Sequence, residues 1–257
     1  MFCLVGLIAS LLALSTVQNG EAPRVPILLY HRLGPTRSDS MTVTTDHFRQ
    51  HLEMLKKEGF TVIPLADFVS WRLGRGPQPP PRSVVLTFDD GHESLYKYGR
   101  ALIEANRMPV TLFIYPSCIS RASYALTWAR LAELAASPLF TIESHTTWHP
   151  NFKKEARERS SESYQEFVES QLRGSRLLLQ ERMKRDVKLL AWPFGIYDGY
   201  LMETAKETGY EAAFSIDCRA ASMSDPQYAL PRCLVSDEYS GPKFLQFLES
   251  ATRRRSH

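Results

Sequence analysis

The chain has 257 residues, of which 44% are hydrophobic and 23% are charged, so it can bury a sizeable core and is not predicted to be disordered. This length suits one large domain or two small ones. The net charge of +3 is weak, and much of it comes from a terminal run at 253–255 that we interpret as a solvated tail, so no nucleic-acid partner is expected.

The first 22 residues are expected to direct export. They contain an apolar stretch about as long as the core of a signal peptide and short for a membrane span, although no Lys or Arg precedes it. We predict that residues 1–22 are a cleaved export signal, with an uncleaved N-terminal anchor or a misplaced sequence start as alternatives. The protein is therefore expected to be periplasmic or extracellular, and to touch a membrane only through an uncleaved N-terminus.

Three cysteines follow this segment, at Cys118, Cys218 and Cys233. An odd number allows one disulfide at most, and a bond between Cys218 and Cys233 is compatible with export. Three buried thiols are the alternative. No C-x-x-C spacing occurs, so a thiolate zinc site is not predicted.

From residue 24 onward, strand-like and helix-like runs alternate. A strand at 24–31 is followed by a helix at 44–60, in which Phe48, Leu52 and Leu55 have the spacing of one helical face. In chain order there follow a strand at 60–65, a helix at 66–73, a proline-rich loop at 74–82, a strand at 83–88, a helix at 94–105 and a strand at 109–116.

The second half repeats this alternation. It has a helix at 127–136, a strand at 139–145, a long polar helix at 160–184, a strand at 187–195, a helix at 198–209, strands at 210–217 and 228–235, and a helix at 242–250. Near-continuous apolar strands alternating with helices are typical of a parallel sheet covered by helices. We predict a single α/β domain, a distorted (β/α) barrel of about seven strands. A doubly wound open sheet is the alternative, although no Gly-rich phosphate loop follows the first strand.

Polar residues that can bind a metal or move a proton follow several of the predicted strands. His31 ends the first strand, Asp89 and Asp90 end the strand at 83–88, and His145 ends the strand at 139–145, with His149 four residues later. The carboxyl ends of parallel strands meet at one rim of a barrel. Adjacent carboxylates after a buried strand repel each other, and a cation would offset that cost.

One carboxylate and two histidines are a common ligand set for zinc, iron, cobalt or nickel. We therefore predict that Asp90, His145 and His149 bind one divalent metal ion, zinc before iron, cobalt or nickel. Asp89 would take a proton from the attacking water. Taken singly, an Asp-Asp-Gly run is often a turn and two histidines four apart are often incidental. His47 and His51 have the same spacing on an amphipathic helix, and we interpret them as surface residues.

The segments "TFDDG" and "SHTTWH" resemble the polysaccharide deacetylases of carbohydrate esterase family 4, with their chitooligosaccharide-deacetylase homology domain. The resemblance implies that Asp89 is the catalytic base and that Asp90, His145 and His149 are the metal ligands. "PILLYHRL", "WPFG" and "LPR" extend it to the bacterial branch that deacetylates poly-N-acetylglucosamine in biofilms, over about residues 25–235. Residues 23–257 would then be the catalytic domain.

Two departures from the family pattern affect the site. Many members have an arginine that pairs with the base where this chain has Ala191, and Arg232 is a candidate replacement. No late Leu-x-His motif is evident, so the general acid would be His31, as in the biofilm branch. The expected substrate-binding residues are Trp192, Phe194, Gly195, Tyr197 and Arg232. The three aromatic residues would stack on sugar rings, with packing at the barrel rim as the alternative.

The expected function is hydrolytic removal of N-acetyl groups from an exported amino-sugar polysaccharide, such as poly-N-acetylglucosamine, chitin-like or peptidoglycan-type chains. An O-acetyl esterase acting on xylan or another acetylated glycan would use the same site. A glycan-binding relic without activity is the alternative of another class, but a binding module has no need of a base. The expected partner is an acetylated polysaccharide or oligosaccharide, and the protein is expected to be a monomer.

Overall fold

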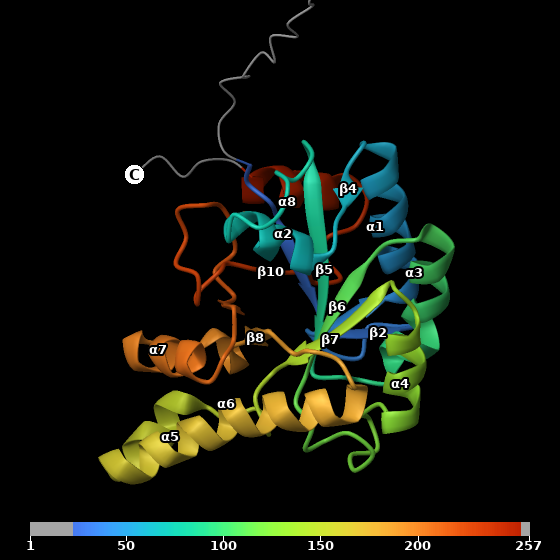
Figure 1. Cartoon of the computed structure of the whole chain (residues 1–257). Helices are drawn as coiled ribbons and strands as arrows, with labels where there is room; N and C mark the ends of the chain where they lie inside the picture. Colours follow the sequence, from blue (N-terminus) through green and yellow to red (C-terminus); the bar gives the residue numbers. More distant parts are fainter. Residues whose placement is uncertain (1–22, 253–257) are drawn as a thin grey trace, which may run out of the picture.

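Eight parallel strands form the main sheet of the computed structural model, which describes residues 23–252 (Figure 1). In spatial order the sheet contains β10 (Cys233–Leu234), β1 (Ile27–Tyr30), β5 (Ser83–Asp89), β6 (Val110–Ile114), β7 (Phe140–Ser144), β8 (Leu189–Ala191) and β9 (Ala212–Phe214), and β4 (Thr61–Val62) pairs with β5. The predicted export signal at 1–22 and the arginine run at 253–255 lie outside the described residues.

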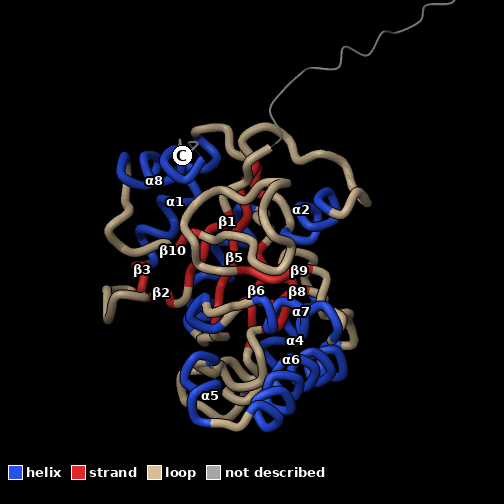
Figure 2. The backbone as a smooth tube through the Cα atoms, turned by 90° about the vertical axis from the view of Figure 1, so that its left-hand side faces the viewer, coloured by secondary structure: helices blue, strands red, loops and turns tan. Residues whose placement is uncertain are grey.

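The two ends of the sheet approach each other, which curves it into a distorted barrel. Leu230, just ahead of β10, forms a parallel bridge with Phe214 at the end of β9. The Leu230 carbonyl oxygen accepts a hydrogen bond of 2.8 Å from the Ser215 N–H. Figure 2 shows the strands in the middle of the fold with helices around them. The predicted single-domain α/β barrel is confirmed.

Helices cover the outside of the sheet (Figure 1). They are α1 (Thr45–Lys57), α2 (Leu65–Arg72), α3 (Arg100–Asn106), α4 (Trp128–Ala136), α5 (Phe152–Glu158), α6 (Ser161–Met183), α7 (Gly199–Glu207) and α8 (Pro242–Thr252). A π-helical turn (Leu95–Gly99) precedes α3, and a 3₁₀ turn (Pro193–Gly195) precedes α7. None of the helices between residues 23 and 252 has both the length and the apolar character of a membrane span.

Several elements differ from the sequence-based expectation. The short helix α5 was not predicted, nor was the separate pair formed by β2 (Arg32–Gly34) and β3 (Thr42–Thr44). The strands expected at 210–217 and 228–235 shrink to three and two residues. Their flanking apolar residues are buried without forming ladders, and burial alone gave the pattern of a longer strand.

The ends of the longer helices have clear sequence causes. The side chains of Thr44, Thr127, Ser160 and Asp198 each accept a hydrogen bond from a backbone N–H in the first turn of α1, α4, α6 and α7, respectively. Such caps satisfy amide groups that have no partner within the helix. The caps of α6 and α7 fix where these two helices start beside the second of the two pockets described below.

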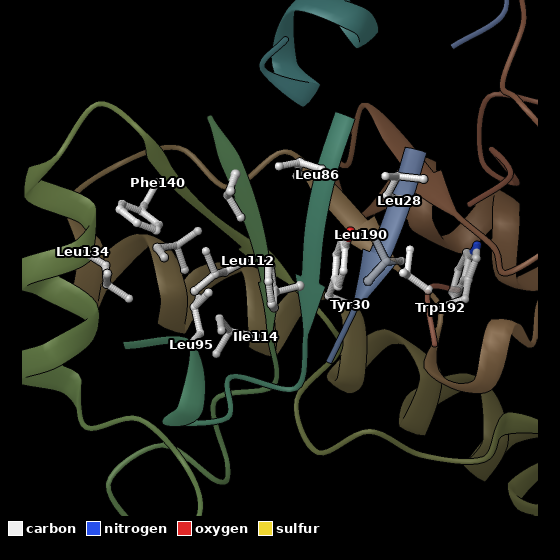
Figure 3. Packing of buried hydrophobic residues seen from close by; sticks show 14 of the residues in the cluster. Leu28, Tyr30, Leu86, Leu95, Leu112, Ile114, Leu134, Phe140, Leu190 and Trp192 are labelled. Carbon is white, nitrogen blue, oxygen red and sulfur yellow. The ribbon is translucent and has the colours of Figure 1, made fainter. Parts of the chain in front are cut away.

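Alternation along the strands separates an outer core from the barrel interior. On β5, Leu86 and Phe88 belong to the large cluster beneath the outer helices, whereas Val85 belongs to a smaller cluster inside the barrel, on which α2 packs. Figure 3 shows part of the outer cluster. Successive side chains point to opposite faces of a sheet, so Asp89, which is four residues from Val85, points into the interior. The same alternation places Trp192 in the outer cluster with Leu190.

His51 is not a surface residue, contrary to the expectation from its spacing with His47. It is fully buried in the stripe of α1 that contains Phe48, Leu52 and Leu55. Its Nε2–H donates to the Tyr239 carbonyl oxygen, its Nδ1 accepts from the Tyr30 hydroxyl at 3.2 Å, and its ring stacks on Phe244. A histidine whose two nitrogens both have partners can occupy a core position.

The cysteines resolve the alternatives left open by the sequence. Cys218 and Cys233 form a disulfide, and Cys118 is a buried free thiol. The disulfide ties the loop after β9 to β10. It therefore fixes the short segment in which Leu230 and Arg232 close the barrel.

Candidate active site

A pocket of about 350 Å³ opens at the carboxyl ends of β1, β5 and β7. Its lining contains the predicted site residues His31, Asp89, Asp90, His145, His149, Trp192 and Phe194, together with Leu29, Arg32, Met41, Ile216 and Leu234. The structure therefore brings together residues that are more than 100 positions apart in the chain. Gly195, Tyr197 and Arg232 lie beside this pocket and are described below.

Asp90, His145 and His149 present three ligand atoms to one point. These atoms all lie within 4.8 Å of one another. The Asp90 Oδ1 atom is 3.8 Å from the Nε2 atoms of both histidines. The two imidazole rings meet edge to face with their centroids 4.6 Å apart. These separations are too long for hydrogen bonds, so the three groups face one another without bonding directly.

The tautomer of His145 is set by the protein. Its Nδ1–H donates to the Ala191 carbonyl oxygen at 2.8 Å, which leaves a lone pair on Nε2 pointing toward Asp90. Burial lowers the pKa of His145 to about 3, although Asp89 opposes the shift, so the ring is neutral. A neutral imidazole held by a second hydrogen bond is the usual form of a metal-binding histidine.

This arrangement of three acceptors fits a bound cation. The His145 Nε2 lone pair and the Asp90 carboxylate repel each other unless positive charge lies between them. Burial raises the pKa of Asp90, and the neighbouring Asp89 raises it further. Two imidazole nitrogens and one carboxylate oxygen are the donors that zinc and other divalent transition metals bind. The residues therefore fit the metal ion predicted from the sequence.

Two of these three residues, and one residue between the histidines, have left-handed backbone. Asp90 has φ 73°, Thr146 has φ 65° and His149 has φ 63°, although none of them is glycine. Such left-handed conformations cost of order 1–3 kcal/mol each and cluster at functional sites. The Thr146 hydroxyl accepts a hydrogen bond of 3.2 Å from the His149 N–H. It holds the tight turn that brings the second histidine back toward the first.

Asp89 has a partner that Asp90 lacks. Its carboxylate forms two hydrogen bonds with the Arg232 guanidinium, Nη1 to Oδ1 at 2.7 Å and Nη2 to Oδ2 at 2.8 Å. Burial alone would raise the pKa of Asp89, but the charge and the hydrogen bonds of Arg232 bring it down to about 2. The Arg232 Nε–H donates to the Ser215 carbonyl oxygen at 3.1 Å, which orients the guanidinium.

Arg232 therefore pairs with Asp89, as expected for an arginine that replaces the one missing at the position of Ala191. The Ala191 side chain is buried inside the barrel, and its carbonyl oxygen orients His145. Arg232 has no exposed surface. The structure thus places it behind Asp89 and outside the pocket lining, where it cannot touch a sugar in the pocket.

His31 lines the same pocket, and its side chain makes no hydrogen bond with the other residues of 23–252. Its Nδ1 atom is buried without a partner in this part of the chain. Burial lowers the pKa of His31, while the carboxylates of Asp89 and Asp90 oppose the shift. Burial prevails, so the imidazole binds a proton less readily than an exposed histidine does.

The aromatic residues expected to stack on sugars are placed differently from one another. Phe194 is 56% exposed at the pocket mouth, with its ring 4.6 Å from that of His149. Trp192 is fully buried in the outer core, with its Nε1–H donating to the Tyr228 carbonyl oxygen. Trp192 therefore has the alternative role, packing in the core, and does not stack on a sugar. Tyr197 lies outside the pocket lining, and its hydroxyl donates to Asp217 at 3.2 Å.

Gly195 allows the turn that presents Phe194. It has φ 65°, and a Cβ atom added there would lie 2.4 Å from the Ile216 side chain. A larger residue would push Ile216, which lines the pocket, out of position. Gly195 therefore acts on the pocket shape.

Several pocket residues were not identified from the sequence. Arg32 follows His31 at the end of the first strand, and that position was a usable signal. Met41 and Ile216 enter from loops and carry no such signal. Tyr115 also borders the site, with its ring 5.5 Å from His149 and its hydroxyl 2.6 Å from that of Tyr124.

The comparisons with known proteins agree on one family. A family model described as polysaccharide deacetylase matches residues 76–213. The Bacillus subtilis protein YxkH is 25% identical over 234 residues, which cover 91% of this chain and 79% of that protein. The poly-beta-1,6-N-acetyl-D-glucosamine N-deacetylase of Staphylococcus aureus strain MRSA252 is 23% identical over 201 residues, covering 77% of this chain and 69% of that enzyme.

A solved structure has the same fold. The Streptococcus pyogenes deacetylase PplD, in complex with acetate, superimposes with a TM-score of 0.78 at 20% sequence identity. The alignment covers 89% of this chain and 99% of that chain.

Asp90→Ala should abolish stoichiometric metal binding, because it removes the only carboxylate of the three-residue ligand set. We expect about one equivalent of divalent metal in the wild-type protein and less than about a tenth in the variant, measured by plasma mass spectrometry after dialysis. Asp186→Ala is the control, because that carboxylate is exposed and pairs only with Lys188. A full equivalent in Asp90→Ala would contradict the assigned site.

Arg232→Met should destabilise the protein by ~3–5 kcal/mol, because it leaves the buried Asp89 carboxylate without a counter-charge. The double variant Asp89→Asn/Arg232→Met should regain part of this loss, since neither group is then charged. Urea unfolding would measure both. Arg173→Met, which removes an exposed i,i+4 pair with Glu169, should cost under about 0.5 kcal/mol. A double variant less stable than Arg232→Met would show that the two groups are not coupled.

Proposed function

The chain belongs to the polysaccharide deacetylase family, and from this membership we propose that it is a metal-dependent hydrolase that removes N-acetyl groups from an amino-sugar polysaccharide. The observation that carries the proposal is that the adjacent carboxylates Asp89 and Asp90 have different surroundings. One carboxylate is held ionised by Arg232, and the other faces two histidines. A glycan-binding protein without activity has no need of an ionised carboxylate beside a metal site.

A divalent ion held by Asp90, His145 and His149 would supply a Lewis acid that polarises the acetyl carbonyl group and makes a nearby water more acidic. Asp89 lies next to this point, with its Oδ2 atom 3.6 Å from the His145 Nε2 atom. Because Arg232 keeps Asp89 ionised, its carboxylate can accept a proton from the attacking water at any working pH. Arg232 also fixes both carboxylate oxygens, so the base does not rotate away.

His31 is the proposed general acid. The amine that leaves an acetamide is a poor anion, so it needs a proton as the carbon–nitrogen bond breaks. His31 lines the same pocket as Asp89. Its Nδ1 atom is buried without a partner in residues 23–252, so Nε2 is the nitrogen that would face the substrate. It is therefore placed to give a proton to the departing nitrogen.

The proposed substrate is a β-1,6-linked N-acetylglucosamine polymer or a related acetylated glycan. Support comes from the Staphylococcus aureus relative, whose name states that substrate. We further propose that residues 23–257 form the catalytic domain, that the protein is exported under the direction of residues 1–22, that it acts as a monomer, and that zinc is the metal.

The function is tested by acetate release from three substrates. These are β-1,6-linked N-acetylglucosamine oligomers, chitooligosaccharides and acetylated xylan, each assayed with added zinc and with Asp89→Asn protein as the inactive control. We expect release from the first substrate, and loss of at least about 100-fold in the control, since an amide cannot accept the proton. Release from xylan alone would indicate an O-acetyl esterase, and no release from any substrate would contradict the proposal.

His31→Ala should lower turnover of acetamide substrates by about 100-fold or more, the usual effect of losing a general acid. The loss should be much smaller on an aryl acetate, whose leaving group needs no proton. Both rates are measured on one preparation with its metal content checked. Equal losses on the two substrates would assign His31 a role in structure or binding instead.

A further inference from the structure

A second pocket, of about 260 Å³, lies between α5, the start of α6 and the turn that leads into α7. Figure 1 shows these three helices together on one side of the molecule. The side chains that give the pocket its chemistry are those of Lys153, Arg157, Tyr164, Tyr197 and Asp198. None of them has a role in the reaction proposed above.

This pocket adjoins the catalytic pocket through two short segments. Lys153 follows the ligand His149 by four residues, and Tyr197 follows Phe194 by three. Three residues span at most ~10 Å of chain. Phe152, on the floor of the second pocket, also contacts Trp192, with ring centroids 6.2 Å apart. Segments of three or four residues therefore connect the linings of the two pockets.

The charged groups of α5 fall into two sets. Lys154 pairs with Glu158, and Arg159, just after the helix, pairs with Glu155. Lys153 and Arg157, the two cations that line the pocket, form no ion pair with any residue of 23–252. The Asp198 carboxylate also faces the pocket, but it already accepts the Leu201 N–H at 2.8 Å as the cap of α7. The pocket lining thus contains two cations and one carboxylate. The Asp217 carboxylate, which holds the Tyr197 hydroxyl, lies outside the lining, with Arg219 also near this hydroxyl.

The rings in the pocket suit a sugar. Tyr164 and Tyr197 are each half-buried, so both have a covered side and an open side. The Tyr197 hydroxyl is held by Asp217. Rigid aromatic groups with a polar tip bind partners that have both apolar faces and hydroxyl groups. The two unpaired cations would supply hydrogen-bond donors to acetyl carbonyl and hydroxyl oxygens.

We infer that this pocket is an accessory subsite that accepts an acetylated residue of the same glycan chain and disfavours a residue that has already been deacetylated. The inference rests on the proposed function. Deacetylation turns a neutral acetamide into an amine, which, like an α-amino group, carries a positive charge below about pH 8. At ~4 Å in water, each unpaired cation lowers the affinity for such a group about fivefold. The enzyme would then leave spaced amines along the polymer instead of continuous blocks.

The test uses a set of β-1,6-linked N-acetylglucosamine pentamers, one fully acetylated and the others with a single amine at each position in turn. We compare kcat/KM for each pentamer at about pH 6 and low ionic strength. Wild-type protein should process at least one amine-bearing pentamer about fivefold more slowly than the acetylated one. Lys153→Glu and Arg157→Glu should each remove or reverse that difference.

Lys154→Glu is the matched control, because it makes the same charge change one residue away, on a side chain outside the pocket lining. It should keep the wild-type preference. The inference is overturned if Lys153→Glu and Arg157→Glu keep that preference, or if Lys154→Glu relieves it equally. If wild-type protein releases no acetate from any pentamer, the proposed function fails. Calorimetric binding of the same pentamers then decides the inference, and equal affinities overturn it.

Discussion

Asp89 and Arg232 form an ion pair inside the barrel, and the arrangement of the site depends on it. Their side chains are 2% and 0% exposed, so neither charge has water to stabilise it. A buried carboxylate without a partner would become protonated and could no longer act as a base. The pair also joins distant parts of the chain, because Asp89 ends β5 whereas Arg232 precedes β10. The segment that leads into β10, the last strand of the chain, thus completes a site that begins at the end of β5.

The same pair accounts for the different roles of two adjacent carboxylates. Alternation along β5 directs Asp89 into the interior, where Arg232 neutralises it. The left-handed backbone at Asp90 then turns that side chain toward His145 and His149. Two like charges therefore face two separate cations, the guanidinium and the metal ion proposed here. The disulfide at Cys233 lies beside Arg232 and ties the residue's segment to the loop after β9.

The sequence was sufficient to predict most of the site because strand ends are easy to recognise. Asp89, Asp90, His145 and His31 each follow an apolar strand, and parallel strands bring such positions to one rim. Side-chain direction was harder to predict. Trp192 directly follows Ala191, the last residue of β8, but its side chain points to the opposite face of the sheet and so enters the outer core. His51 has the position of a core residue on α1, and only its contacts with Tyr30 and Tyr239 show how its polar atoms are satisfied.

Residues brought in by loops could not be predicted in the same way. Met41 and Ile216 reach the pocket through irregular segments whose paths depend on the whole fold. The accessory subsite depends on α5, a helix of seven residues with too few turns to give a clear apolar pattern. Once the helix is known, the sequence indicates which of its cations pair, because Lys154 lies four residues before Glu158 whereas Lys153 lies four residues before Arg157.

The most direct test of the central interaction is a carbon-13 NMR titration of the Asp89 carboxyl carbon in metal-free protein, assigned by its loss in Asp89→Asn. A pKa of about 2 predicts that the chemical shift stays constant from about pH 7 down to about pH 3. A titration with its midpoint at or above the ordinary aspartate value of about 4 would contradict the account. It would mean that Arg232 does not hold Asp89, the proposed base, ionised.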